Sequence, residues 1–208
     1  MKEKVLVLSP HTDDGEIGAG GTIAKFIENG GEVFYAAFST CEKSISEEFP
    51  KDILKSEVRK ATAVLGIKPE NLNILDYPVR EFSSRRQEIL QEMIDINKKI
   101  NPDIVFTPCS NDTHQDHEVI SRESFRAFKK TSILGYEEPW NCRVIKSDIF
   151  VTLSESNINK KIMALKEYES QKRDYLNHEF IRSLAKVRGT QIGKSLAETF
   201  EVIRWIIK

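Results

Sequence analysis

The segment KVLVLSPHTDDGEIGAGG, residues 4–21, determines how we interpret both the fold and the chemistry of this chain. Residues 4–9 form a short apolar run that ends before a proline, which is typical of a buried strand. A glycine-rich turn after such a strand often cradles a phosphate with backbone N–H groups. Here the turn carries His11 and three acidic residues, Asp13, Asp14 and Glu16. Their carboxylates would repel a phosphate. The GAGG run also matches neither GxGxxG nor GK[ST], so we interpret the turn as a cation site.

Further strands and helices follow from the same kind of pattern. Short apolar segments at residues 32–39, 71–77 and 102–108 predict strands. Helices are predicted at residues 20–29 and 117–129. Between them, the spacing of Leu54, Val58, Ala61 and Leu65 predicts a helix that ends at Gly66. Ser84 and Gln87 resemble a capping box, which predicts the start of a further helix. Strands and helices that alternate at this spacing predict an α/β protein with a Rossmann-like, three-layer α/β/α fold and a mostly parallel sheet.

The C-terminal part of the chain is less regular. Residues 156–171 and 180–189 are predicted to be helical, whereas residues 196–207 fit either a strand or a helix. No proline- or glycine-rich linker marks a boundary. We therefore expect one domain over residues 1–208, in which residues 1–130 form the core with the functional motifs and residues 131–208 complete the fold and a pocket wall.

Composition argues against several classes of partner. The 208 residues include 31 Lys and Arg against 32 Asp and Glu, so no net field attracts nucleic acid or an anionic membrane. No apolar run approaches the roughly 20 residues of a membrane span. The three cysteines are odd in number and form no CxxC pair: Cys41, Cys109 and Cys142. We therefore expect neither a disulfide framework nor a cysteine zinc site. This cysteine usage fits a cytoplasmic protein.

Two short polar motifs contain three of the four histidines. His11-Thr12-Asp13-Asp14 follows the first predicted strand, and His114-Gln115-Asp116-His117 follows the fourth. The carboxyl ends of parallel strands lie at one edge of a sheet, so both motifs can meet in one crevice. Two histidines and one carboxylate with an open coordination position are typical of catalytic zinc sites, although iron, cobalt and nickel accept the same ligands.

With these motifs the sequence resembles the PIG-L or LmbE-like de-N-acetylases. Residues 10–21 are similar to the family motif PHPDDEIGxGG, and residues 102–117 to PDxVFTPxxxDxHxDH. Weaker similarity at residues 56–67 and 197–204 extends the resemblance over almost the whole chain. The chain departs from the pattern in three ways: Thr12 replaces a proline, Gly15 is inserted, and Leu54 stands where many members carry an arginine.

The resemblance implies a zinc hydrolase that removes the N-acetyl group of an N-acetylglucosamine-type sugar by attack of a metal-bound water on the amide. Its metal ligands would be His11, Asp14 and His117, with Zn²⁺ or alternatively Fe²⁺ bound. Asp13 would be the general base. His114, if protonated and oriented by Asp116, would support the oxyanion. The substrate would be a small amino-sugar compound, with no nucleic acid or membrane partner, and an architecture of this kind often forms homo-oligomers.

Substrate contacts are less well defined by the sequence. Candidates are Arg80, Asp112, Trp140 and Arg188, with Lys55 or Arg80 in place of the missing arginine. We expect no catalytic role for Cys109 and a surface position for His178.

Two alternatives remain from the residues alone. A metal-dependent phosphoesterase has similar clusters but usually needs more carboxylates, because it holds two metals. A non-enzymatic, receiver-like α/β domain with a magnesium pocket would explain Asp13 and Asp14, but it leaves the histidines without a role.

Overall fold

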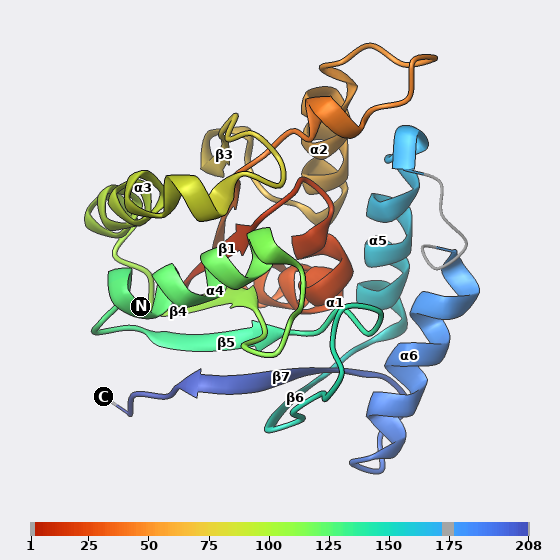
Figure 1. Ribbon diagram of the computed structural model, residues 1–208. Coiled ribbons are helices and arrows are strands. Elements are labelled where there is room, and N and C mark those ends of the chain that lie inside the picture. The colour runs from red at the N-terminus through yellow and green to blue at the C-terminus, as the bar shows by residue number, and fades with distance from the viewer. Residues whose placement is uncertain (1–2, 172–176, 208) are drawn as a thin grey trace.

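The computed structural model describes residues 3–171 and 177–207. Its sheet has the strand order β3-β2-β1-β4-β5-β7-β6 (Figure 1). The strands are β1 Lys4–Ser9, β2 Glu32–Ala37, β3 Leu72–Ile74, β4 Ile104–Pro108, β5 Ser132–Tyr136, β6 Ile149–Thr152 and β7 Ala197–Arg204. Strands β1 to β5 are mutually parallel, and β7 is antiparallel to both of its neighbours. The predicted mostly parallel sheet is confirmed.

Helices cover both faces of this sheet. They are α1 Asp14–Glu28, α2 Ile53–Leu65, α3 Arg86–Ile100, α4 Gln115–Ala127, α5 Glu155–Lys166 and α6 His178–Thr190. Because side chains alternate along a strand, Val5 and Val7 of β1 face the core beneath α1 and α2, whereas Leu6 and Leu8 face α3 and α4. Helix α5 packs against α1 and α2 on the first face. The predicted three-layer α/β/α fold is therefore confirmed.

The centre of the sheet positions the two polar motifs. Strand β1 pairs directly with β4, with Val5 opposite Ile104 and Val7 opposite Phe106. Both strands run in the same direction, so the turn from β1 into α1 and the loop from β4 into α4 leave the sheet side by side. Residues about 100 positions apart in the sequence thereby reach one crevice, as the motif spacing predicts.

The C-terminal part of the chain extends the same sheet. The segment left ambiguous between strand and helix forms β7, and two strands that we did not predict, β5 and β6, flank it. Helices α5 and α6 lie side by side next to this part of the sheet (Figure 1). No helix in the described ranges, 3–171 and 177–207, is both long and apolar enough to cross a membrane.

Two predicted helix starts are wrong. Helix α1 begins at Asp14, six residues before the predicted start at residue 20, because its glycines pack tightly against neighbouring side chains despite their low helix propensity. The Ser84–Gln87 capping box is absent. The Ser84 hydroxyl instead donates to the carbonyl of Glu81, within a 3₁₀ turn at Phe82–Arg85, and α3 follows without a side-chain cap.

Gly18 marks the closest of these approaches, and its replacement is our stability prediction. A Cβ atom at Gly18 would lie 2.2 Å from the Tyr136 ring, which is fully buried in β5. We expect Gly18→Ala to lower the free energy of unfolding by about 1–3 kcal/mol, although alanine favours the helix by roughly 1 kcal/mol. Urea unfolding measures this. The double variant with Tyr136→Leu should lose less than the sum of the single variants, and an unchanged Gly18→Ala midpoint would contradict the packing argument.

Candidate active site

The turn after β1 places His11 and Asp14 together. The backbone N–H of His11 donates to Asp14 Oδ2 over 2.7 Å, which folds the turn back on itself. Asp14 is also the first residue of α1, where the helix dipole favours a negative charge. The Gly15 N–H donates to Ser9 Oγ over 3.0 Å and ties the helix start to the end of β1. The turn is thus fixed by its own backbone.

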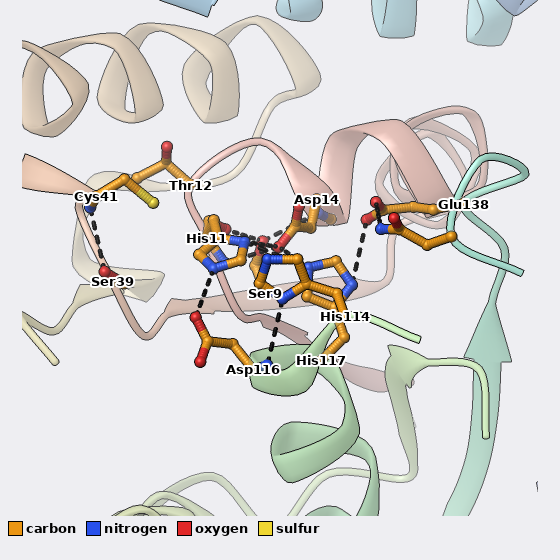
Figure 2. A network of polar contacts seen from close by, with 12 residues as sticks. Ser9, His11, Thr12, Asp14, Ser39, Cys41, His114, Asp116, His117 and Glu138 are labelled. Atoms are coloured by element: carbon orange, nitrogen blue, oxygen red, sulfur yellow. Dashed lines mark hydrogen bonds and ion pairs between the residues drawn. The ribbon is translucent and has the colours of Figure 1, made fainter. Parts of the chain in front are cut away.

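Three side-chain atoms converge at this turn (Figure 2). His11 Nδ1 and His117 Nε2 lie 3.1 Å and 3.2 Å from Asp14 Oδ2, and the two nitrogens lie 3.2 Å from each other. Three ligands bound at 2.0–2.1 Å to one tetrahedral zinc would be about 3.3 Å apart. The donor atoms therefore have the chemistry and the spacing that a divalent metal ion requires.

The electrostatics of the three residues also favour a cation. Burial opposes ionisation of Asp14, yet His117 and His11 hold its pKa well below its usual value. Burial likewise opposes protonation of His11, but Asp14 and Asp116 outweigh it and raise the pKa of His11 to about 9. The carboxylates thus create a negative potential strong enough to stabilise positive charge on a buried imidazole. A divalent ion would neutralise the same potential.

Two further carboxylates hold the imidazoles by their other nitrogens. Asp112 Oδ2 lies 2.8 Å from His117 Nδ1, and Asp116 Oδ2 lies 3.1 Å from His11 Nε2. Such contacts fix the tautomer and ring orientation of a metal-binding histidine. Asp112, predicted to contact substrate, instead holds His117. The carboxylate of Asp116 holds His11 rather than His114, which it reaches only through its backbone N–H.

Removal of one of these orienting contacts gives a measurable prediction. Asp112→Asn should weaken metal affinity by about 10–100-fold, because the His117 ring loses its charged partner while the metal-binding atoms remain. Competition with a chromogenic chelator measures the affinity. Asp148→Asn is the matched control. Asp112 accepts the backbone N–H of His114, and Asp148 likewise accepts that of Val202, but Asp148 does not line the cleft. Equal affinities for both variants would show that Asp112 does not support the site.

Asp13 and His114 line the same cleft as the three donor atoms. Asp13 is the N-cap residue of α1, but its side chain forms no capping hydrogen bond to the helix. His114 Nδ1 accepts the N–H of Asp116 over 3.2 Å, so a neutral ring carries its proton on Nε2. Burial and the nearby His117 and His11 lower the pKa of His114 to about 4. The neutral imidazole of His114 is therefore favoured, so the condition that the ring be protonated, under which the sequence gave His114 its role, is not met.

The cleft has a volume of about 310 Å³. Its wall beyond the metal donors and Asp13 includes Ile17, Cys41, Ser44, Leu54, Val79, Arg80, Glu138, Trp140, Asn141 and Gln171. Of the predicted substrate contacts, Arg80 and Trp140 lie in this wall. Arg188 does not, because it forms a mostly buried, two-point ion pair with Glu137 at 2.8 and 2.6 Å. Lys55 pairs with Glu42 outside the wall.

Among the described residues that line the cleft, Arg80 is the one with a lysine or arginine side chain. Its backbone has a φ of +68°, a strained conformation for a residue with a side chain. The conformation is held by the Arg80 N–H, which donates to Asp116 Oδ2 over 2.6 Å. The guanidinium donates to Ser44 Oγ over 3.2 Å. Asp116 therefore couples the position of Arg80 to that of His11.

Glu138 is a functional candidate that sequence reasoning missed. It was missed because it follows β5, a strand that we did not predict. The sequence signal for it is a pair of glutamates directly after the apolar run SILGY. The residue is 2% exposed, and Oε1 has no hydrogen-bond partner among the described residues. Oε1 lies 3.9 Å from His117 Nδ1, on the cleft side of the β5 loop (Figure 2). Burial, then Asp14, raises the pKa of Glu138 well above its usual value.

A buried polar cluster supports the turn from behind. Glu16 contacts the hydroxyl groups of Tyr35 and Tyr168, and the Tyr168 hydroxyl donates to the Thr12 carbonyl over 2.6 Å. Burial raises the pKa of Glu16 to about 8. A Cβ atom at the inserted Gly15 would lie 2.6 Å from Tyr35 Oη, so only glycine fits there. The cluster thus holds the turn at Gly15, next to Asp14.

Comparison with known proteins agrees with this geometry. A model of the PIG-L family, described as GlcNAc-PI de-N-acetylase, matches residues 6–128, the part of the chain that holds both polar motifs. The chain belongs to the PIG-L family. The diacetylchitobiose deacetylase of Thermococcus kodakarensis is 28% identical over 94% of this chain and 81% of its own length.

Two solved structures have the same architecture as this chain. The N,N'-diacetylchitobiose deacetylase of Pyrococcus horikoshii matches with a TM-score of 0.79 and 25% identity, over 97% of this chain and 84% of that one. GalB, the 4-carboxy-2-hydroxymuconate hydratase of Pseudomonas putida KT2440, matches with a TM-score of 0.82 at 21% identity, over 99% of this chain and 98% of that one. A hydratase on this fold means that the reaction must be argued from the site.

Proposed function

We propose that this protein is a metal-dependent N-deacetylase that hydrolyses the acetamide of an N-acetylglucosamine-type sugar. The observation that carries the proposal is the convergence of three metal-binding atoms, from His11, Asp14 and His117, beside Asp13 and His114 in one cleft. Membership of the PIG-L family and the deacetylases among its relatives support it. The products would be acetate and the free amino sugar.

Zinc is the metal we propose, since imidazole and carboxylate ligands suit it, with Fe²⁺ as the alternative. When bound, the ion would polarise the acetyl carbonyl and lower the pKa of a coordinated water to about 7. His11, Asp14 and His117 would hold it. Asp116 and Asp112 would keep the two rings in the orientation that presents Nδ1 of His11 and Nε2 of His117.

Proton transfer would be carried out by Asp13. Its carboxylate removes a proton from the attacking water and later gives that proton to the departing nitrogen. Asp13 and Asp14 are adjacent where the turn becomes α1, and Asp13 lines the cleft beside the three donor atoms. The two neighbouring carboxylates would therefore divide the roles of base and ligand.

His114 would stabilise the tetrahedral intermediate. Because Nδ1 accepts a backbone hydrogen bond, the Nε2–H of the neutral ring is the group that donates to the developing oxyanion. Loss of one such donor typically lowers the rate by about 10²–10³-fold. This role does not require a protonated imidazole, consistent with the low pKa of His114.

Substrate recognition would involve the cleft wall. Trp140, about one-third exposed, offers a flat surface for a sugar ring, and Arg80 offers donors for hydroxyl oxygens. Glu138 Oε1 would accept a hydrogen bond from a sugar hydroxyl or from the amine that the reaction produces. An acidic cleft of this kind favours an uncharged, hydroxyl-rich substrate over a phosphate ester, which argues against the phosphoesterase alternative.

The role of Glu138 gives a prediction. Glu138→Leu should lower kcat/KM for the acetylated sugar by about 2–10-fold, the effect of losing one uncharged hydrogen bond, because Leu has no acceptor oxygen in place of Oε1. Metal content should stay the same, because Glu138 approaches the His117 nitrogen that Asp112 already holds. Steady-state kinetics and elemental analysis on one preparation measure both. Unchanged kcat/KM would show that Oε1 makes no substrate contact, and loss of metal would make Glu138 a ligand.

The proposed activity is tested by acetate release from N-acetylglucosamine and N,N'-diacetylchitobiose, with and without a chelator. We expect release that stops with the chelator and returns when zinc is added back. A phosphate monoester tested in parallel should not be hydrolysed. Binding of magnesium without any hydrolysis would instead favour the receiver-like alternative.

A further inference from the structure

Two cysteines that are 33 residues apart in the sequence meet beside the active site. Cys109 follows β4 at the start of the loop that carries the second polar motif, and Cys142 lies in the loop after β5. Their Sγ atoms are 3.0 Å apart, about 1 Å longer than the S–S distance of a disulfide. A small movement of the side chains would bring the sulfurs to bonding distance.

The backbone around the two cysteines is already paired. The Cys109 N–H donates to the Tyr136 carbonyl over 2.9 Å, and the Thr113 N–H donates to the Asn141 carbonyl over 3.1 Å. Between them, Asp112 and Cys142 form an antiparallel bridge. The two loops are therefore held at the separation that a disulfide between these side chains would need, so closing the bond would not require the loops to rearrange.

We propose that Cys109 and Cys142 form an oxidisable dithiol that closes to an intrachain disulfide, a modification site that joins the metal-ligand loop to the cleft wall. On one side of the bond lies Asp112, which orients His117. On the other side lie Glu138 and Trp140 of the wall. The inference concerns the covalent state of the chain and does not depend on the reaction proposed above.

The two thiols differ in the way that such chemistry needs. Cys142 is half-buried and Cys109 is buried, so Cys142 meets a dissolved oxidant first. The contact between the two sulfurs lowers the pKa of Cys142 and raises that of Cys109. A thiolate is the nucleophile in disulfide exchange, so the lowered pKa also favours Cys142 as the first to react.

With a low-molecular-weight disulfide as oxidant, the reaction has two steps. The Cys142 thiolate attacks glutathione disulfide, forms a mixed disulfide and releases one glutathione. Cys109 loses its proton and attacks the Cys142 sulfur, which forms the intrachain bond and releases the second glutathione. Two protein thiols are oxidised by two electrons in total, and one glutathione disulfide is reduced to two glutathiones.

Cys41 provides an internal control. It lines the cleft, and burial followed by Asp13 and Asp14 raises its pKa, so it is a poorer nucleophile than Cys142. Trypsin would place the three cysteines in separate peptides, residues 26–43, 100–122 and 131–143. A cross-link between the second and third peptides is therefore unambiguous.

The test is mass spectrometry of the full-length protein incubated with glutathione disulfide. We expect the intact mass to fall by two hydrogen atoms, alkylatable thiols to fall from three to one, and peptides 100–122 and 131–143 to be joined. The melting temperature of the oxidised protein should exceed that of the reduced protein by roughly 5–10 °C, because the bond closes a loop of more than 30 residues.

Variants separate this outcome from nonspecific oxidation. Cys41→Ser should still form the cross-link. Cys142→Ser should fold, because the position is half-buried, but it should form no cross-link and gain no thermal stability on oxidation. In Cys109→Ala, Cys142 should stop at the glutathione adduct. A stable glutathione adduct on Cys142 of the unmodified chain, or a cross-link that includes peptide 26–43, would overturn the proposal.

Discussion

Asp13→Asn is expected to lower kcat for acetate release by about 10²–10⁴-fold, the contribution typical of a general acid–base group. The substitution preserves size but removes the group that accepts the proton from water. Metal content should remain the same, because the donor atoms belong to His11, Asp14 and His117. Kinetics at saturating substrate, with elemental analysis of the same sample, measures both quantities.

The control for Asp13 is another helix N-cap. Asp52 precedes α2 as Asp13 precedes α1, and neither side chain forms a capping hydrogen bond to its helix. Asp52→Asn lies outside the cleft and should keep full activity. If Asp13→Asn also kept near-normal kcat, another group would have to be the base, and the role we assign to Asp13 would be wrong.

Asp14→Asn should act mainly on metal binding, which precedes the proton transfer assigned to Asp13. Asp14 Oδ2 contacts both imidazoles and the His11 N–H, so it is the centre of the donor set. Loss of its charge should weaken metal affinity by more than the 10–100-fold expected for an orienting residue such as Asp112. Isothermal titration with zinc measures the affinity. Activity should fall with occupancy and recover in part at high zinc concentration.

Glu155→Gln is the matched control for Asp14→Asn. Glu155 is the first residue of α5, as Asp14 is of α1, so both substitutions remove a negative charge from a helix N-terminus. Glu155→Gln should bind zinc normally. If both variants bound zinc as the unmodified chain does, Asp14 would not be a ligand, and the donor set would have to be sought elsewhere in the cleft.

The parts of the fold nearest the motifs could be predicted because their sequence signals are local. The apolar run KVLVLS forms β1 with the bounds expected, and β4 falls within the predicted strand at 102–108. The parallel pairing of β1 with β4 then follows from the alternation of strands and helices. This pairing is what brings His11 and His117 together, so the meeting of the two polar motifs in one crevice could be predicted from the sequence, whereas the proposed ligand set came from the family resemblance.

The roles of the supporting carboxylates could not be predicted in this way. Asp112 and Asp116 lie beside histidines in the sequence, but their hydrogen bonds depend on how α4 begins and on which nitrogen each ring turns inward. Arg188 was expected in the pocket but pairs with Glu137, a residue of the unpredicted β5 loop. Such contacts depend on tertiary structure and have no short-range signature.

The glycine-rich start of α1 illustrates the same limit. Four glycines in eight residues, 14–21, have low helix propensity, so local reasoning placed the helix start too late. In the structure, Gly15, Gly18 and Gly21 meet Tyr35, Tyr136 and Leu153 at distances that no side chain could occupy. Tertiary packing overrides propensity here, and the helix start that it stabilises is the one that positions Asp14.

The proposed function requires one metal ion, held by His11, Asp14 and His117, for deacetylation. We would remove metal with a chelator, add zinc back stepwise and follow acetate release from N,N'-diacetylchitobiose at each point. We expect acetate release to rise linearly and to reach a plateau at one zinc per chain. Acetate release that is independent of zinc, or no release at full zinc occupancy, would contradict the proposed function.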